Sequence, residues 1–218
     1  KDAVGDAAGA SSLMRESLDI FRKKFGNKHP TTATSLHNLA ELLKFQGDFS
    51  GALPLHREAL ALRRKLLSEE HPHVALSKRG LGDVLRMMGD DVAAEPLLRE
   101  ARDTQRRILG QQHYEVGTTL ANLSSLLMER GDYAAAESVA RDALEVYRNA
   151  FGPDHAYTAA VLYRVAELRI VQQDSMEGER LHRDALSMRR AKLPPDHADF
   201  VLSLVALGTA LVELNRLD

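Results

Sequence analysis

Five of the nine histidines stand out because they recur at a fixed interval of 42 residues. They are His29, His71, His113, His155 and His197. Imidazole is a common zinc ligand, but zinc needs all its ligands about 2 Å from one centre. Corresponding residues of stacked helix layers are separated by about 10 Å, so this column cannot converge on one ion. We therefore expect these histidines to serve in turns, and we predict no metal site and no cofactor.

The remaining histidines also have a structural interpretation. His56 and His182 share one repeated position, and we expect packing in the core there rather than ligation. His73 is expected to be exposed, and His37 is the one histidine that we place on a binding surface.

A second repeated position carries an arginine in each copy: Arg15, Arg57, Arg99, Arg141 and Arg183. Such a column could follow the phosphates of a nucleic acid. In three copies, however, a glutamate lies four residues before the arginine, as Glu95 does before Arg99. On a helix this spacing forms surface ion pairs worth a few tenths of a kcal/mol each. The net charge of −2 also gives no general attraction for polyanions, so we predict no nucleic-acid partner and no membrane association.

No catalytic motif is recognisable in the sequence. It has no glycine-rich nucleotide loop, no HExxH and no GxSxG, and we predict that the chain is not an enzyme. The absence of cysteine removes disulfides and thiol nucleophiles and fits a reducing, cytoplasmic setting. The longest nearly apolar run, residues 200–212, is too short to cross a bilayer.

The elements that must position these residues follow the same interval of 42. Gly-Asp pairs at 47–48, 89–90 and 131–132 each separate two amphipathic stretches. Apolar residues recur at steps of three and four, which predicts helices, and a fixed period of this length predicts an all-α solenoid of about ten helices. The predicted helices cover residues 7–24, 30–45, 49–66, 72–87, 91–109, 114–129, 133–150, 156–171, 175–192 and 198–214.

We interpret residues 1–218 as one solenoid, cut from a longer protein because both ends fall inside a repeat. The predicted units are a half repeat at 1–28, repeats at 29–70, 71–112, 113–154 and 155–196, and a half repeat at 197–218.

Helix starts and stops have local causes. Asp48, Asp90, Asp132 and Asp174 stand where a second helix needs an N-cap acceptor. The preceding glycines suit a left-handed turn residue. Pro54 and Pro96 fall about one turn inside second helices, where we expect a small kink or a late helix start.

Packing is predicted from columns of residue size. Small residues recur at three positions, which are Ala40, Gly82, Ser124, Ala166 and Gly208; Ala10, Ala52, Ala94, Ala136 and Gly178; and Ala59, Ala101, Ala143 and Ala185. Larger residues are expected to fill the space between them: Leu13, Leu55, Leu97, Val139 and Leu181. Repeat 71–112 departs from the pattern, because Lys78 replaces a leucine and Arg102 another. Either these side chains extend their charged ends into water, or this repeat is the weak part of the array.

The arrangement of large residues at 36, 39 and 43, a small one at 40 and alanines at 52 and 59 resembles the tetratricopeptide repeat. The interval of 42, with histidine before the first helix and a GDY-like turn, looks like the kinesin-light-chain type of this repeat. The resemblance implies a right-handed superhelix of antiparallel helix pairs whose first helices line a concave groove. It further implies that a peptide or a helix of a partner protein binds in that groove, without catalysis.

By this resemblance the groove residues are Asn38, Arg79, Arg86, Asn122, Tyr163 and Arg164, with Phe45 and Met87 on the same face. The asparagines match those that bond a bound peptide's backbone in the family, and the arginines would take carboxylates. Tyr163 would pack an apolar group. An equally open alternative is a solvated face of internal salt bridges, since Lys44 and the arginines are balanced by acids such as Glu41 and Asp83.

Two further alternatives concern partners. The array could instead be a regulatory segment of a larger signalling protein, a kinase or an NTPase, and bind its own catalytic domain. Apolar residues increase toward the C-terminal end, among them Leu202, Val205 and Val212. They predict either an apolar ligand pocket or self-association through a last helix whose partner helix is missing.

Overall fold

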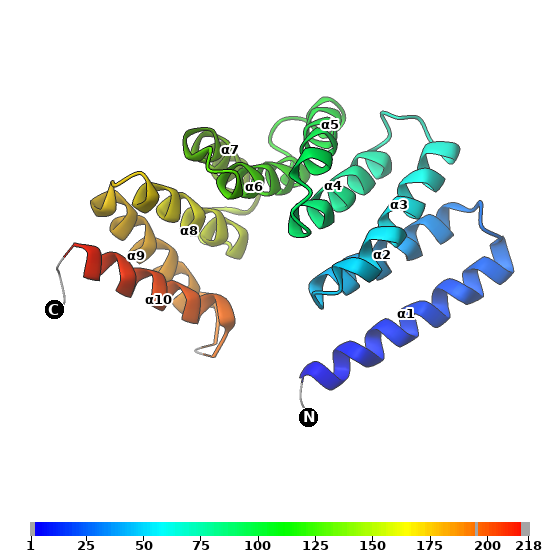
Figure 1. Cartoon of the computed structure of the whole chain (residues 1–218), viewed down its shortest axis with the longest axis horizontal. Coiled ribbons are helices and arrows are strands. Elements are labelled where there is room, and N and C mark those ends of the chain that lie inside the picture. Colours follow the sequence, from blue (N-terminus) through cyan, green and yellow to red (C-terminus); the bar gives the residue numbers. More distant parts are fainter. Residues whose placement is uncertain (1–2, 195, 215–218) are drawn as a thin grey trace. The chain divides into compact units, whose positions relative to one another are not determined.

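The computed structural model describes residues 3–194 and 196–214, and these contain ten α-helices and no strand (Figure 1). The helices are α1 (Ala3–Phe25), α2 (Pro30–Phe45), α3 (Phe49–Leu66), α4 (Pro72–Met87), α5 (Asp91–Leu109), α6 (Tyr114–Glu129), α7 (Tyr133–Phe151), α8 (Ala156–Val171), α9 (Ser175–Lys192) and α10 (Ala198–Glu213). Apart from the start of α1, every predicted boundary is right to within one residue. Residues 1, 2, 195 and 215–218, which belong to the predicted repeats, lie outside the described residues.

The helices form two compact units, residues 1–108 and residues 109–218. In unit 1, α2 packs against α3, α3 packs against α4, and the two first helices α2 and α4 also touch. In unit 2, α6 packs against α7, α8 against α9, and the first helices α8 and α10 touch. Each unit is thus a stack of helix hairpins in which like helices are neighbours, as a solenoid requires.

The turn inside each helix pair has one repeated geometry. The N–H of Asp48 bonds the carbonyl of Leu43 at 2.9 Å, and the N–H of Gly47 bonds that of Lys44 at 3.0 Å. This is a Schellman ending, which needs a left-handed residue at the glycine position. Gly47, Gly89 and Gly131 have φ of 79°, 80° and 81°, whereas the fourth copy places Gln173 there with φ 65°.

The aspartates after these glycines cap the second helices, as predicted. The Oδ1 atom of Asp48 accepts the N–H of Gly51 at 2.8 Å, and Asp90, Asp132 and Asp174 accept from the corresponding residues. The five histidines cap the first helices in a parallel way, since each Nδ1 accepts the N–H two residues on, at 3.1–3.3 Å. The prediction of a turn role for this column is confirmed.

The core of each unit lies between facing columns of small and large side chains. Ala40, Ala52, Ala59, Ala94 and Ala101 are completely buried. A Cβ added at Gly82 would lie 2.9 Å from the side chain of Leu98 and 3.2 Å from the carbonyl of Ala94, so α4 and α5 approach too closely for any larger residue.

One packing expectation fails, and one of the two outcomes expected at the internal prolines is excluded. Leu13 was expected to fill the core but is 66% exposed, because the N-terminal helix α1 packs chiefly against α2 and offers its other side to solvent. No late start occurs at Pro54 or Pro96, because α3 begins at Phe49 and α5 at Asp91 and both run through the proline.

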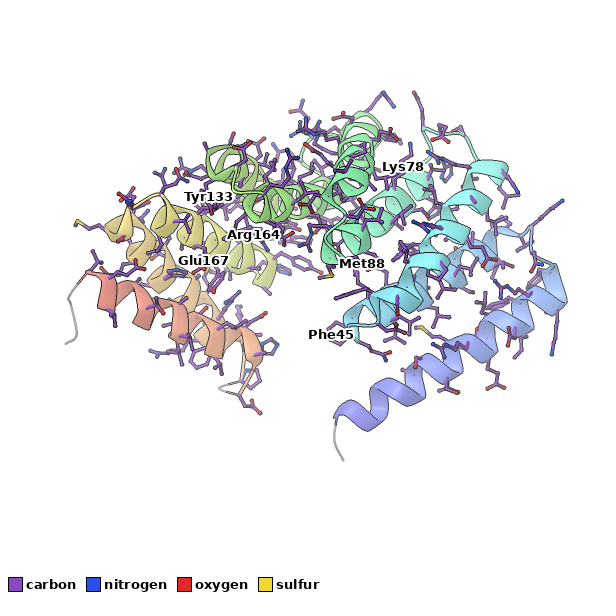
Figure 2. All side chains as sticks on the ribbon, viewed as in Figure 1. Phe45, Lys78, Met88, Tyr133, Arg164 and Glu167 are labelled. Carbon is purple, nitrogen blue, oxygen red and sulfur yellow. The ribbon has the colours of Figure 1, made fainter. Side chains whose placement is uncertain are left out.

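Lys78 bears on the first of the two interpretations of repeat 71–112, in which its charged end extends to the surface. The residue is only 5% exposed, so its aliphatic part occupies the leucine position. Its Nζ reaches Glu69 at 2.9 Å and Glu100 at 3.1 Å, both of which are exposed (Lys78 is labelled in Figure 2). The side chain therefore carries its charge to the surface, where two carboxylates receive it.

We predict that Gln173→Gly raises the free energy of unfolding by about 0.5–1 kcal/mol, because glycine adopts the left-handed conformation without steric cost. The matched control is Gly131→Gln, which should lower stability by a similar amount. A Cβ at Gly131 would meet nothing within 4 Å, so its cost is conformational. Urea denaturation followed by circular dichroism measures both, and equal stability of all three proteins would contradict the prediction.

We predict that Lys78→Leu leaves stability unchanged or raises it by about 1 kcal/mol, because ion pairs to exposed carboxylates contribute little and leucine fills the buried position. Lys78→Ala should instead lower the free energy of unfolding by about 2 kcal/mol, since it leaves a cavity at this position. Thermal and urea denaturation of both variants test this. A leucine variant as unstable as the alanine variant would show that the ion pairs, not the buried stem, stabilise the repeat.

Candidate functional site

The six predicted groove residues fall into two sets of three. Asn38, Arg79 and Arg86 lie on the first helices of unit 1, and Asn122, Tyr163 and Arg164 lie on those of unit 2. The contact between α2 and α4 places the first set on neighbouring helices. The two sets are described separately.

The two asparagines have amide groups available for a ligand. Asn38 is exposed on α2, and Asn122 is half-buried on α6. Neither side chain makes a hydrogen bond to any residue that the structure describes. A primary amide offers two donors and an acceptor, the groups needed to pair with a peptide backbone.

A network of charges joins α2 to α4. Lys44 Nζ lies 2.7 Å from Glu41 Oε2 and 2.9 Å from Asp83 Oδ2. Asp83 also accepts Arg86 Nη2 at 3.0 Å. Burial alone would raise the pKa of Asp83, but Lys44 and Arg86 outweigh it and hold that pKa below its ordinary value. Part of this face is therefore built of internal salt bridges, and Arg86 meets a ligand only together with Asp83.

Exposed apolar side chains lie beside this network. Phe45, the last residue of α2, is 87% exposed, and Met87 and Met88 at the end of α4 are exposed too. Figure 2 shows Phe45 and Met88 at the C-terminal ends of these two helices. An apolar group among charged neighbours is suited to anchoring a side chain of a binding partner.

Tyr163 is held by its own unit. Its ring meets His182 edge-on, with 5.1 Å between the ring centroids, and the Arg189 guanidinium lies 5.0 Å from the centre of the ring. Burial and the nearby Glu167 carboxylate raise the pKa of the tyrosine hydroxyl. Arg164 and Glu167 lie on the same helix, α8, and are labelled in Figure 2. Tyr163 thus has a packing role, and only part of its ring is available to a ligand.

The last described helix exposes apolar residues. Val201, Leu202, Leu204, Val205 and Val212 on α10 are all exposed, while Ser203 and Ala210 are buried. This is the surface on which self-association was predicted.

The arginine column lies on second helices, as predicted. Arg99, Arg141 and Arg183 pair with the glutamates four residues before them at 2.6, 2.8 and 2.7 Å. These three arginines are therefore already paired with carboxylates on their own helices, and would have to give up those ion pairs to bind phosphate.

The structure also brings together three residues that the sequence analysis treated apart. His37 and Glu41 on α2 and His56 on α3 have possible ligand atoms within 4.8 Å of one another. Burial lowers the pKa of His37 to about 2, with further lowering by the positive charge of Arg63, and burial lowers that of His56 to about 4. Both imidazoles are neutral at physiological pH. His37 was predicted to lie on a binding surface, but that prediction is wrong, because its side chain packs against His56 and is only 6% exposed. The i,i+4 spacing of His37 and Glu41 was visible in the sequence, but the approach of His56 was not considered.

None of the described helices is both long and apolar enough to cross a membrane.

Comparisons with known proteins bear on the fold. A family model described as tetratricopeptide repeat matches residues 3–65, 46–107, 73–149 and 115–170. The search of curated proteins gave no match.

Solved structures of two proteins are similar in fold. The crystal structure of BtubC (BKLC) from P. vanneervenii superposes with a TM-score of 0.78 at 20% identity, covering 99% of this chain and 86% of that one. A kinesin-light-chain-like protein of Podosopora anserina with nearly identical TPR-like repeats gives a TM-score of 0.72 at 19% identity, covering 87% of this chain and 90% of its own.

We predict that Asp83→Asn lowers the free energy of unfolding at neutral pH by about 2 kcal/mol, because two half-buried cations lose their shared counter-charge. Since the folded-state pKa of Asp83 is lowered, the stability it contributes is complete above about pH 4 and is lost as the pH falls further. The variant should therefore lose less stability than the native chain in this acid range.

The matched control is Asp103→Asn, which breaks an exposed pair with Arg102 at 2.8 Å. It should cost less than about 0.5 kcal/mol. Urea denaturation at pH 7 and pH 3 checks both variants, and equal effects would show that the α2–α4 network adds no more than a surface pair.

Proposed function

This chain belongs to the tetratricopeptide-repeat family, whose repeats are generally non-catalytic protein–protein interaction modules. We propose that the first helices of each of its two units bind an extended peptide segment of a partner protein. The observation that carries this proposal is the pair of equivalent asparagines, Asn38 and Asn122, whose amides have no partner among the described residues. They supply backbone hydrogen bonds that do not depend on the sequence of the peptide.

Selectivity comes from the neighbours of the asparagines. On unit 1, the exposed Phe45 and Met87 accept an apolar side chain, and Arg79 supplies positive charge. On unit 2, Arg164 and the accessible part of Tyr163 play the same two roles. We therefore expect a ligand with an apolar residue close to a carboxylate.

The partner is a protein rather than a nucleic acid or a membrane, because a net charge of −2 gives no general attraction for polyanions. A reducing compartment such as the cytoplasm suits a chain without cysteine. The peptide has two possible sources, a separate protein or another segment of the polypeptide to which these repeats belong.

A peptide-display selection on the native chain, followed by titration of the selected peptides, tests the proposal. We predict that Asn38→Ala or Asn122→Ala weakens binding about 5–10-fold, the loss of one or two neutral hydrogen bonds of about 0.5–1.5 kcal/mol each. The matched control is Arg57→Ala, which changes an exposed side chain on a second helix and should leave affinity unchanged. Circular dichroism establishes that all variants are equally helical.

Selected peptides that bind both asparagine variants as tightly as the native chain would move the site away from the first helices. A selection that enriches no peptide would overturn the proposal in its present form.

A further inference from the structure

The cluster of His37, Glu41 and His56 in unit 1 has the composition of a metal site. His37 and Glu41 are one helical turn apart on α2, and His56 faces them from α3. Among the residues that the structure describes, this is the one group of three histidine or carboxylate side chains whose ligand atoms converge within 4.8 Å. Two imidazoles and a carboxylate form a ligand set typical of zinc.

Several polar atoms in this cluster have no hydrogen-bond partner although they are buried. They are Nδ1 of His37, Oε1 of Glu41 and both ring nitrogens of His56. His37 is 6% exposed and His56 is completely buried. His56 Nε2 lies 3.4 Å from Glu41 Oε1, but this contact lacks hydrogen-bond geometry. Buried polar atoms normally have a hydrogen-bond partner. Four such atoms without one, gathered in one cluster, indicate a site for a ligand that binds them.

The surrounding residues hold the carboxylate in place. Lys44 binds Oε2 of Glu41 at 2.7 Å, which leaves Oε1 on the side of His56. Lys44 is itself fixed by Asp83 at 2.9 Å. Such bonds from outside orient a ligand before any metal arrives.

Gly80 provides the space for this arrangement. A Cβ there would lie 2.6 Å from Cε1 of His56 and 3.0 Å from Oε1 of Glu41. Any larger residue on α4 would push these two side chains out of position.

The electrostatic environment is mixed. Burial lowers the pKa of His37 most, and the positive charges of Arg63, Arg79 and Lys44 lower it further. The same charges oppose a divalent cation. The lowered pKa values keep both imidazoles unprotonated, so their lone pairs are free for a metal at neutral pH. The carboxylates of Glu41 and Asp83 offset part of the positive charge. We therefore expect weaker binding than at four-ligand structural sites.

We propose that His37, Glu41 and His56 bind a single first-row transition-metal ion, zinc above all, with the fourth coordination position left to water. Neutral nitrogen ligands favour zinc over magnesium or calcium, which prefer all-oxygen sites. The three proposed ligands lie on α2 and α3, and the metal proposal does not depend on peptide binding.

Unit 2 contains a matched arrangement that lacks one ligand. Glu167 and His182 occupy the positions of Glu41 and His56, with His182 Nε2 3.0 Å from Glu167 Oε1. The position of His37 is taken by Tyr163. The ring contacts are alike, since His37 meets His56 edge-on at 5.4 Å and Tyr163 meets His182 edge-on at 5.1 Å. The fold therefore accepts histidine or tyrosine at this position, and only histidine adds a third nitrogen or oxygen donor suited to zinc.

Titration of the chain, free of any histidine tag, with ZnCl₂ in a calorimeter and with CoCl₂ in a spectrometer tests the proposal. We expect one Zn²⁺ per chain and visible absorption bands of four-coordinate Co²⁺. His37→Tyr copies the arrangement of unit 2, so it should keep the fold and weaken binding roughly 100-fold or more. Tyr163→His should create a second site and raise the stoichiometry from one ion to two.

The control for adventitious surface binding is His73→Ala, which removes an exposed histidine beside His71. It should leave the affinity and the cobalt spectrum unchanged. Three results would overturn the proposal: no stoichiometric binding by the native chain, equal binding by His37→Tyr, or loss of binding in His73→Ala. Peptide affinity measured with and without zinc is a separate readout, so failure of the metal site leaves the peptide proposal standing.

Discussion

The tight turn between the two helices of each pair is the constraint on which the other features depend. A left-handed residue and an aspartate cap reverse the chain within a few residues, at 47–48, 89–90, 131–132 and 173–174. So short a turn brings the helices into close contact beside it, where only small residues fit. Ser124 shows how close this contact is, since its hydroxyl donates to the carbonyl of Ala136 on the other helix at 2.9 Å. The turn therefore sets the small-residue columns, and these set the packing of each hairpin.

The features of the fold that depend on residues close together in the chain could be predicted from the sequence. Helix boundaries follow from caps and left-handed glycines, and both act within a few residues of the chain. Proline placement was harder, because a proline about one turn inside a helix removes a single bond that packing can compensate. The exposure of Leu13 could not be predicted from its repeated position. That position indicates which face of a helix packs, but not whether another helix is present to cover it.

Contacts between helices could be predicted only in part. Lys44 and Asp83 are far apart in the chain, and their pairing depends on side-chain conformations that no periodicity reveals. The approach of His37 to His56 did leave a signal. Antiparallel helices pair residues at similar distances from their turn, and these two histidines stand on either side of Gly47 at nearly equal separation. Comparing each histidine only with its own column concealed this relation, because a column runs along the stack and not across the hairpin.

The stack itself does not require the glutamate–histidine pair. The other two full repeats build the same layer with Asp83 opposite Leu98, and with Ser125 opposite Ala140, at the equivalent positions. Where the pair occurs, it buries ring nitrogens without partners, an arrangement that packing alone disfavours. In unit 2 the tyrosine ring of Tyr163 covers that pair and Arg189 covers the tyrosine. In unit 1 His37 keeps the same ring contact while adding a donor atom, so one substitution that the packing tolerates converts a packing motif into a set of three ligands.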